Sequence, residues 1–460
     1  MGQEDEGMTK SLYPAATDPS AKGINEETVR MISRAKGEPQ WMLEFRLESL
    51  RAFLTKPTPS WGPDLSELKF DEIRYFVPAE TEKASDWKSL PIGIRREYEQ
   101  LGVPEAERRF TMGMQAQLDS EVVYGRVQEE LDRKGVIFLD TDTALREHPA
   151  LFRRYFGTIV PPSDNKFAAL NMAAWSGGAF IHVPAGVQLE LPLHSYFRVR
   201  SKQIGQFEHT LIVLEDNAYV NYIEACTAPM HALDALHAGV VEVYVGPGAR
   251  CRFTSIQNWA KDIFNLATKR AVTRRGGLME WIGGNIGAHI TMGYPSVYLS
   301  EPDARAEMLS ICVAGAGQHQ DAGTKIIHAA ENTTSQVISK SISRGGGRST
   351  FRSLIQVQHG AVGSKSHVVC DSLIVDSKSR CDTYPELDVL ERDAEVSHEA
   401  SVSKIEGEQL FYLMSRGISE AEASEMIVSG FVEPLAKELP LCYAQQLNEL
   451  IRMEMNSAVG

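Results

Sequence analysis

Residues 370–405 read CDSLIVDSKSRCDTYPELDVLERDAEVSHEASVSKI, a run that places two cysteines, a histidine and several carboxylates among alternating strand-forming residues. In a strand, every second side chain lies on the same face of the sheet. Thiolate, imidazole and carboxylate groups bind iron, and a cluster that lacks some thiolates is held more weakly than one bound by four cysteines. The run therefore predicts a metal-binding face on a rigid sheet, suited to a cargo that is passed on.

Strand patterns of this kind begin after Phe167. Short runs of β-branched residues alternate with turns in which a polar residue or a glycine precedes an alanine, as in Asn217-Ala218, Gly248-Ala249 and Asp303-Ala304. This spacing suits a parallel β-helix, in which each strand pairs with its equivalent in the next coil, and a β-sandwich is the main alternative. Because the strand-rich region has no clear break, we expect a mainly β fold with a parallel β-helix over residues 166–404.

Helical patterns flank the strands. The N-terminal region, residues 25–165, is expected to be helical and mixed, with a further helical piece at 120–134. Its first helical run has apolar residues at helical spacing, followed by two prolines: Leu43, Leu47, Leu50, Leu54, Pro57 and Pro59.

The C-terminal region, residues 405–460, is also expected to be helical. Ser419 and Glu422 have the spacing of a capping box, and a last helix is expected after Pro440. At the other end, residues 1–24 form an acidic lead that we expect to be disordered.

Composition excludes several classes of function. The chain of 460 residues is 43% hydrophobic and 23% charged, and its net charge of -14 disfavours contact with nucleic acid or anionic membranes. No apolar run is long enough for a membrane helix, and the N-terminus lacks a secretory signal, so we expect a cytoplasmic protein. The six cysteines form no Cys-x-x-Cys pair and are expected to stay reduced: Cys226, Cys251, Cys312, Cys370, Cys381 and Cys442.

Two glycine-rich segments are not nucleotide-binding motifs. Residues 359–366, HGAVGSKS, have Ser364 where a phosphate-binding loop needs a glycine before the lysine. Residues 314–320, AGAGQHQ, lack the third glycine of a dinucleotide fingerprint. The chain is therefore not expected to hydrolyse ATP.

The spacing of Cys381 and His398 suggests how a coiled fold would bring them together. Seventeen positions separate the two residues, and a coil of that length would place them on neighbouring strands about 4.8 Å apart. Glu399 follows His398 directly, so the two side chains point to opposite faces unless a bulge or a strand end lets both bind metal.

Longer segments of the chain, from about Glu26 to Gly460, resemble the SufB/SufD family of iron-sulfur cluster assembly subunits. The similar segments are YIEACTAP (222–229), NLATKRAV (265–272), MEWIGGNIGAHITMGYPSVYL (279–299), GQHQDAGTKIIH (317–328), SKSIS (339–343), CDSLIVD (370–376), HEASVSKI (398–405) and EQLFYLMSRGISEAEASEMIVSGF (408–431). The resemblance implies a right-handed parallel β-helix between helical regions, the second of which binds the SufC ATPase.

Further implications of the resemblance concern partners and cargo. It implies a second core subunit, SufD or another SufB, and sulfur delivered as persulfide from a cysteine desulfurase or sulfur carrier. A transient [4Fe-4S] or [2Fe-2S] cluster would form between the two β-helices, with reduced flavin in some complexes. The chain itself would be a scaffold and not an enzyme.

Matched position by position, the resemblance assigns Cys370 and Cys381 as sulfur acceptors or cluster ligands, and Cys381, His398 and Glu399 as metal ligands. Cys226 is left out of this predicted site. The chain departs from many members of the family at three positions, with Thr273 where some have cysteine, Cys381 where others have serine, and Ser397 where many have glutamate.

Two other functions fit parts of the sequence. A β-helix enzyme, either a carbohydrate lyase or a metal-dependent enzyme, would use His182 and His194, which flank the turn at Pro184 to Gly186. A structural subunit resembling SufD would need no thiol of its own. Loss of cluster binding on replacement of Cys370 and Cys381 would distinguish the scaffold from both.

Overall fold

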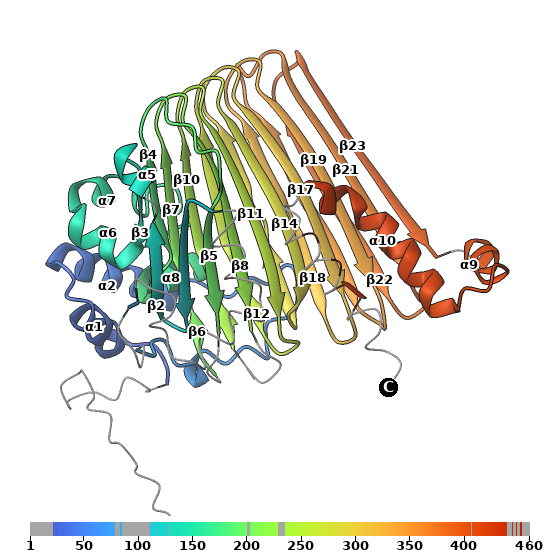
Figure 1. Cartoon of the computed structure of the whole chain (residues 1–460), viewed down its shortest axis with the longest axis horizontal. Coiled ribbons are helices and arrows are strands. Elements are labelled where there is room, and N and C mark those ends of the chain that lie inside the picture. The colour runs from blue at the N-terminus through green and yellow to red at the C-terminus, as the bar shows by residue number, and fades with distance from the viewer. Residues whose placement is uncertain are drawn as a thin grey trace, which may run out of the picture.

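The structure is a computed structural model, and it describes residues 22–78, 83–84, 111–127, 129–199, 203–228, 235–405, 407–438, 444, 448 and 451–452. Most of the expected acidic lead and much of the expected last helix, with Cys442, lie outside these residues. The described chain is built mainly of strands, which stack into a parallel β-solenoid with helices at both ends (Figure 1).

Two long sheets form the walls of the solenoid. In the first sheet, the strands lie in the order β2-β1-β5-β8-β11-β14-β17-β19-β21-β23. These strands are β1 (Gly113–Leu118), β2 (Glu121–Val127), β5 (Leu193–Arg198), β8 (Tyr219–Thr227), β11 (Arg250–Trp259), β14 (Leu278–Gly287), β17 (Arg305–Ala314), β19 (Thr334–Ser343), β21 (Ser364–Ile374) and β23 (Ala394–Lys404).

The second sheet faces the first. Its strands are β3 (Ile137–Asp140), β4 (Ala179–Val183), β6 (Gly205–Gln206), β7 (His209–Leu214), β9 (Leu236–His237), β10 (Val240–Val245), β12 (Phe264–Asn265), β13 (Thr268–Thr273), β15 (Ile290–Gly293), β16 (Ser296–Leu299), β18 (His319–His328), β20 (Arg348–Val357) and β22 (Arg380–Val389). Within the described residues, β1 with β2 and β3 with β4 are antiparallel pairs, whereas every other pair of these strands is parallel and joins strands of adjacent coils. This pattern confirms the parallel solenoid and excludes the β-sandwich.

A column of left-handed turns fixes the length of each coil. One residue in each turn has positive φ, between 56° and 75°, and its backbone N–H donates to a carbonyl of the next coil at 2.6 to 3.1 Å. Successive members lie 27 to 31 residues apart: Gly186, Asn217, Gly248, Gly276, Asp303, Asn332 and Gly363. Glycine and asparagine are the residues that adopt this conformation at least cost.

The core lies between the two sheets. Because strand side chains alternate, every second residue points inward, and a single buried cluster runs from Ile181 and Leu193 to Val368 and Cys370. Continuous burial along the axis makes each coil depend on its neighbours for its apolar contacts.

Helices cover the N-terminal end of the solenoid: α1 (Glu26–Ala35), α2 (Gln40–Thr55), α5 (Glu129–Arg133), α6 (Thr141–Glu147), α7 (Pro149–Tyr155) and α8 (Lys166–Ala174). The helical expectation over residues 120–134 was wrong for its first half, because residues 121–127 form β2 and pair with β1. In the sequence, the charged residues Glu121 and Arg126 obscure the strand pattern of this segment.

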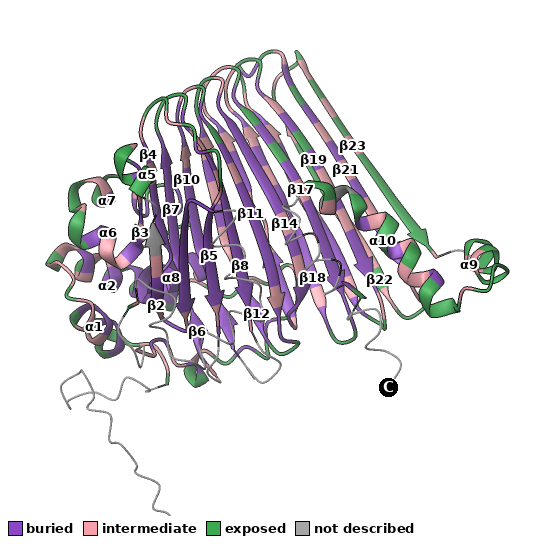
Figure 2. Ribbon diagram, in the orientation of Figure 1, coloured by how far each residue is buried: buried purple, intermediate pink, exposed green. Residues whose placement is uncertain are grey.

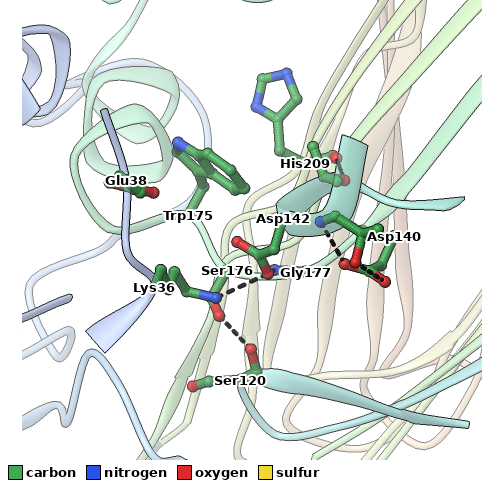
Figure 3. A network of polar contacts seen from close by, with 12 residues as sticks. Lys36, Glu38, Ser120, Asp140, Asp142, Trp175, Ser176, Gly177 and His209 are labelled. Carbon is green, nitrogen blue, oxygen red and sulfur yellow. Dashed lines mark hydrogen bonds and ion pairs between the residues drawn. The ribbon is translucent and has the colours of Figure 1, made fainter. Parts of the chain in front are cut away.

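Polar contacts attach this cover to the first coils (Figure 3). Lys36 forms an ion pair with Asp142 at 2.8 Å, and the Asp142 carboxylate also accepts a hydrogen bond from the backbone N–H of Gly177 at 2.9 Å. The Arg46 guanidinium is fully buried and donates to Glu38 and to the carbonyl oxygens of Ala173 and Trp175. This buried cation has four acceptor atoms and specifies how the helices sit, since loss of Glu38 would leave its charge unpaired.

Two helices follow the last strand. Helix α9 (Gly407–Met414) lies beyond the end of the solenoid, whereas α10 (Glu420–Glu438) folds back along the outer face of the first sheet (Figure 1). Val428 and Val432 are buried against that face, and Arg252 forms an ion pair with Glu438 at 2.5 Å. None of the helices in the described residues is long and apolar enough to span a lipid bilayer.

The turn column makes a direct prediction for stability. Gly276 has φ of +62° and open space where a Cβ would stand, so Gly276→Ala adds only backbone strain and should lower the free energy of unfolding by about 1–2 kcal/mol. Gly283, on β14, also has open space but no positive φ, so Gly283→Ala is the matched control. Urea unfolding of both variants measures the difference, and equal midpoints would contradict the role of the turn.

Candidate functional site

Cys370 lies inside the last coils of the solenoid. It is on β21, only 1% exposed, and its neighbours across the sheet are Ser339 on β19 and Ala400 on β23. Its Sγ atom is 4.0 Å from Oγ1 of Thr383, on the facing strand β22. Burial raises the pKa of the Cys370 thiol to about 12, so the resting group is a neutral thiol.

Cys381 points into the same interior from the opposite wall. It is half-buried on β22, and its Sγ atom is 3.9 Å from Oγ of Ser341 on β19. The Ser341 hydroxyl donates to Ser372, two residues from Cys370, at 2.9 Å. The two predicted thiols therefore share one interior space.

His398 and Glu399 point to opposite faces of β23. His398 pairs in register with buried Val368, so it points inward, and its ring centroid is 6.3 Å from that of Phe351. Its Nε2 atom finds no hydrogen-bond partner within the described part of the chain, and burial lowers the pKa of this imidazole. Glu399 is exposed on the outer face, and the strand has no bulge that would turn it inward.

The coil is not seventeen residues long, so the condition that would have placed Cys381 and His398 on neighbouring strands is not met. Strand partners near this site lie 30 to 32 residues apart, as in Cys370 with Ala400 and Ser349 with Cys381. Cys381 and His398 consequently belong to different sheets and not to neighbouring strands of one sheet. Phe351 connects the two walls, because its neighbour in register is Thr383 and its ring lies close to His398.

The solenoid is open at this end. In the described part of the chain, no strand covers the outer edges of β22 and β23. Leu387 and Val402 continue inward-facing columns, yet they are 46% and 56% exposed. Strand β23 is exposed along much of its length (Figure 2). A solvent-exposed strand edge beside an uncovered core is a surface that natural proteins usually protect.

A second group of metal-binding side chains lies deep inside the solenoid. Glu208, Cys226 and His237 are buried, and their ligand atoms all lie within 4.8 Å of one another. Burial raises the pKa of Glu208 and lowers that of His237, but their ion pair outweighs both effects and holds the carboxylate and the imidazolium charged. Burial, followed by the charges of Glu224 and Glu208, raises the pKa of the Cys226 thiol.

Hydrogen bonds extend this group into a polar chamber. His237 Nδ1 contacts Asn265 Oδ1 at 2.7 Å, and Asn265 donates to Gln257 at 2.6 Å. Lys269 donates to Ser255 at 2.8 Å and to Glu224 at 3.1 Å. Residues of this network line a cavity of about 50 Å³, together with Ser310 of a later coil.

Two interior columns of one sheet connect the chamber to the open end. The first column, in strict register, is Glu224, Ser255, Gly283, Ser310, Ser339 and Cys370. The second, two residues further along each strand, is Cys226, Gln257, Asn285, Cys312, Ser341 and Ser372. At a strand spacing of roughly 4.8 Å, five steps span about 24 Å. We call these columns the polar stripe.

Sequence reasoning missed the chamber because Cys226 was judged as a single buried cysteine. A signal for the chamber was present in the sequence: polar residues recur at the coil spacing set by the turn column, as in Glu224, Ser255 and Ser310. Such a pattern is visible only once the coil length is known.

His182 and His194 do not form one site. Each adjoins an inward-facing core residue, Ile181 or Leu193, so each points outward, and the two lie on different sheets. His182 contacts Glu215 at 3.0 Å, and burial lowers the pKa of His194 to about 3. The arrangement gives no support to a metal-dependent enzyme that uses this pair.

Comparisons with known proteins agree with this geometry. Residues 197–431 match the family model of the SUF system FeS cluster assembly SufBD core domain, and residues 115–194 match that of the SufBD protein N-terminal region. The chain is similar to the iron-sulfur cluster assembly protein SufB of Bacillus subtilis, with 51% identity over 96% of this chain and 95% of the relative. Iron-sulfur cluster assembly SufBD family proteins of Staphylococcus haemolyticus and Staphylococcus epidermidis are 50% and 51% identical over the same shares.

Burial predicts the order in which the thiols react. Brief treatment of the native chain with iodoacetamide at neutral pH should label Cys381 well before the other described cysteines, because those four thiols are buried: Cys226, Cys251, Cys312 and Cys370. Peptide mass spectrometry gives the extent at each position, and labelling in denaturant, where all should react alike, is the control. Labelling of Cys370 as fast as Cys381 would contradict the buried position.

Proposed function

The chain belongs to the SufB/SufD family of iron-sulfur cluster assembly proteins, and from this premise we propose that it is the scaffold on which the cluster is built. The observation that carries the proposal is the polar stripe, with a buried thiol at one end and two thiols beside the open end at the other. A subunit with a purely structural role would have no need of this interior connection.

Cys370, Cys381 and His398 are the groups that would hold the nascent cluster. All three point toward the interior at the open end, and a set of two thiolates and one imidazole leaves iron incompletely ligated. Incomplete ligation favours release to an acceptor protein. Glu399, which faces outward, would take part only through the second subunit.

Sulfur would enter as persulfide from a cysteine desulfurase or a sulfur carrier. Cys226 is the thiol best placed to receive it in the interior, because it begins the second column of the polar stripe and lies in the chamber beside Glu208 and His237. Hydroxyl, amide and thiol groups of the polar stripe line the interior between Cys226 and Cys370.

The open end is the place for a second core subunit, SufD or another copy of this chain. The free edges of β22 and β23 can add strands, and the exposed apolar residues beside them would be covered: Tyr384, Leu387, Val389, Leu390 and Val402. A cluster at this end would thus form between two solenoids, in the cytoplasm where thiols remain reduced.

Helix α9 is the proposed contact for the SufC ATPase. Phe411 is 74% exposed, and Tyr412 and Met414 beside it are also exposed, on a helix that extends beyond the solenoid (Figure 1). Aromatic and methionine side chains of this kind are typical anchors of interfaces. Because α9 follows β23 directly, movement of the ATPase would act on the open end.

Anaerobic reconstitution tests the scaffold proposal. The wild-type chain, supplied with ferrous iron, a cysteine desulfurase and cysteine, should bind iron and acid-labile sulfide, whereas Cys370→Ala with Cys381→Ala should lose most of both. Cys251→Ala, which removes a buried thiol outside the polar stripe, is the matched control. Circular dichroism confirms that each variant is folded.

Failure of the wild-type chain to bind iron and sulfide under these conditions would defeat the proposal. Full cluster binding by the folded double variant would instead favour the structural role of a SufD-like subunit.

The proposed ATPase contact has its own test. Phe411→Glu should weaken binding of SufC at least about tenfold, because it places a charge where an aromatic side chain would be desolvated. Leu54→Glu, on α2 at the opposite end, alters an equally exposed apolar residue and should leave the affinity unchanged. Calorimetric titration with SufC measures both, and equal affinities would remove α9 from the interface.

A further inference from the structure

The persulfide that the scaffold receives is not yet at the oxidation level of the cluster. Its outer sulfur is sulfane sulfur, and each sulfide ion of a cluster carries two more electrons. The reduction must occur close to the point of assembly, because free hydrosulfide diffuses away. A second thiol beside the persulfide can supply both electrons by forming a disulfide.

Cys370 and Cys381 are placed for this reaction. Two contacts cross the interior: Cys370 on β21 lies 4.0 Å from Thr383 on β22, and Cys381 on β22 lies 3.9 Å from Ser341 on β19, the strand next to β21. Thr383 is two residues from Cys381 on the same face of β22, so the thiols are diagonal neighbours across the interior. Cys381 is also close enough to act electrostatically on Cys370.

Movement of one strand, β22, can bring the sulfur atom of Cys381 closer to that of Cys370. Strand β22, which carries Cys381, pairs only with β20 among the described strands, whereas β21, which carries Cys370, is held between β19 and β23. An edge strand can shift toward its neighbour at lower cost than a central strand.

We propose that Cys381 resolves a persulfide on Cys370, which deepens the scaffold function and rests on it. The Cys381 thiolate attacks the Sγ atom of Cys370, the S–S bond of the persulfide breaks, and hydrosulfide leaves with the bonding electron pair. A Cys370–Cys381 disulfide forms, and the sulfane sulfur has gained two electrons. An external dithiol then reduces the disulfide by exchange and restores both cluster ligands.

The surroundings favour release of hydrosulfide over transfer of the outer sulfur to Cys381. Transfer would leave the negative charge on the buried Sγ atom of Cys370, whereas hydrosulfide can carry its charge away through the open end. Hydrosulfide comes from a stronger acid than this buried thiol and is the better leaving group. It also departs into the polar end of the stripe, beside Ser339 and Ser372.

The chain offers a direct assay of the disulfide. Trypsin cuts after Lys365, Lys378, Arg380 and Arg392, so Cys370 and Cys381 each fall in a peptide with no other cysteine. The anaerobic full-length chain is treated with glutathione persulfide, desalted and left without reductant. The wild type should release sulfide and yield the two peptides joined by a disulfide, and dithiothreitol should then separate them.

Matched variants show which cysteine holds the persulfide and which one releases the sulfide. Cys381→Ser should retain persulfide on Cys370 and release sulfide at least about tenfold more slowly until dithiothreitol is added. Cys370→Ser should form no joined peptide, and Cys251→Ser, which removes a buried thiol outside both the polar stripe and the pair, should behave as the wild type.

The outcomes separate this step from the scaffold function. Persulfide that stays on Cys370 in the wild type, or sulfide release that is unchanged in Cys381→Ser, would overturn the resolving role while leaving sulfur acceptance intact. If the wild type takes up no persulfide, both the resolving step and sulfur acceptance by Cys370 fail.

Discussion

The backbone hydrogen bonds between successive coils set the strand register, and the core, the chamber and the polar stripe all depend on that register. Each left-handed turn donates to the turn of the next coil, and each strand pairs in register with its equivalents before and after it. A column of inward-facing positions therefore persists along the whole sheet. Because the register does not slip between β8 and β23, residues about one coil apart in sequence become neighbours about 4.8 Å apart in space.

This register allows polar groups to be buried in an otherwise apolar solenoid. Glu224 and Lys269 are charged groups in the interior, and their position is tolerable only because each meets hydrogen-bonding partners from a neighbouring coil or the facing wall. The same rule applies to the serines near Cys370, which bond to one another between coils. Burial in turn keeps Cys226, Cys312 and Cys370 protonated at rest, so the interior is protected from oxidation without disulfides.

The two ends of the molecule have different physical character. At the N-terminal end, helices and buried ion pairs such as Arg46 with Glu38 close the core. At the C-terminal end, β22 and β23 leave apolar side chains and one strand edge each uncovered within the described residues (Figure 2). The core is therefore closed at the N-terminal end, whereas the C-terminal end has apolar surface and strand edges that a partner protein could cover. The thiols at the open end lie where such a partner would enclose them.

The sequence alone determined the class of fold, because alternating side chains and turns with a residue suited to positive φ are local features. Its motifs also predicted a site of Cys370, Cys381, His398 and Glu399, of which the structure turns the first three toward the interior. The sequence did not give the coil length, it assigned residues 121–127 to a helix, and it left Cys226 out of the predicted site. Only the tertiary structure decided which residues share a column, since that depends on a register set by hydrogen bonds between segments about thirty residues apart. For the same reason, the chamber, the polar stripe and the opposite orientations of His398 and Glu399 became clear only in three dimensions.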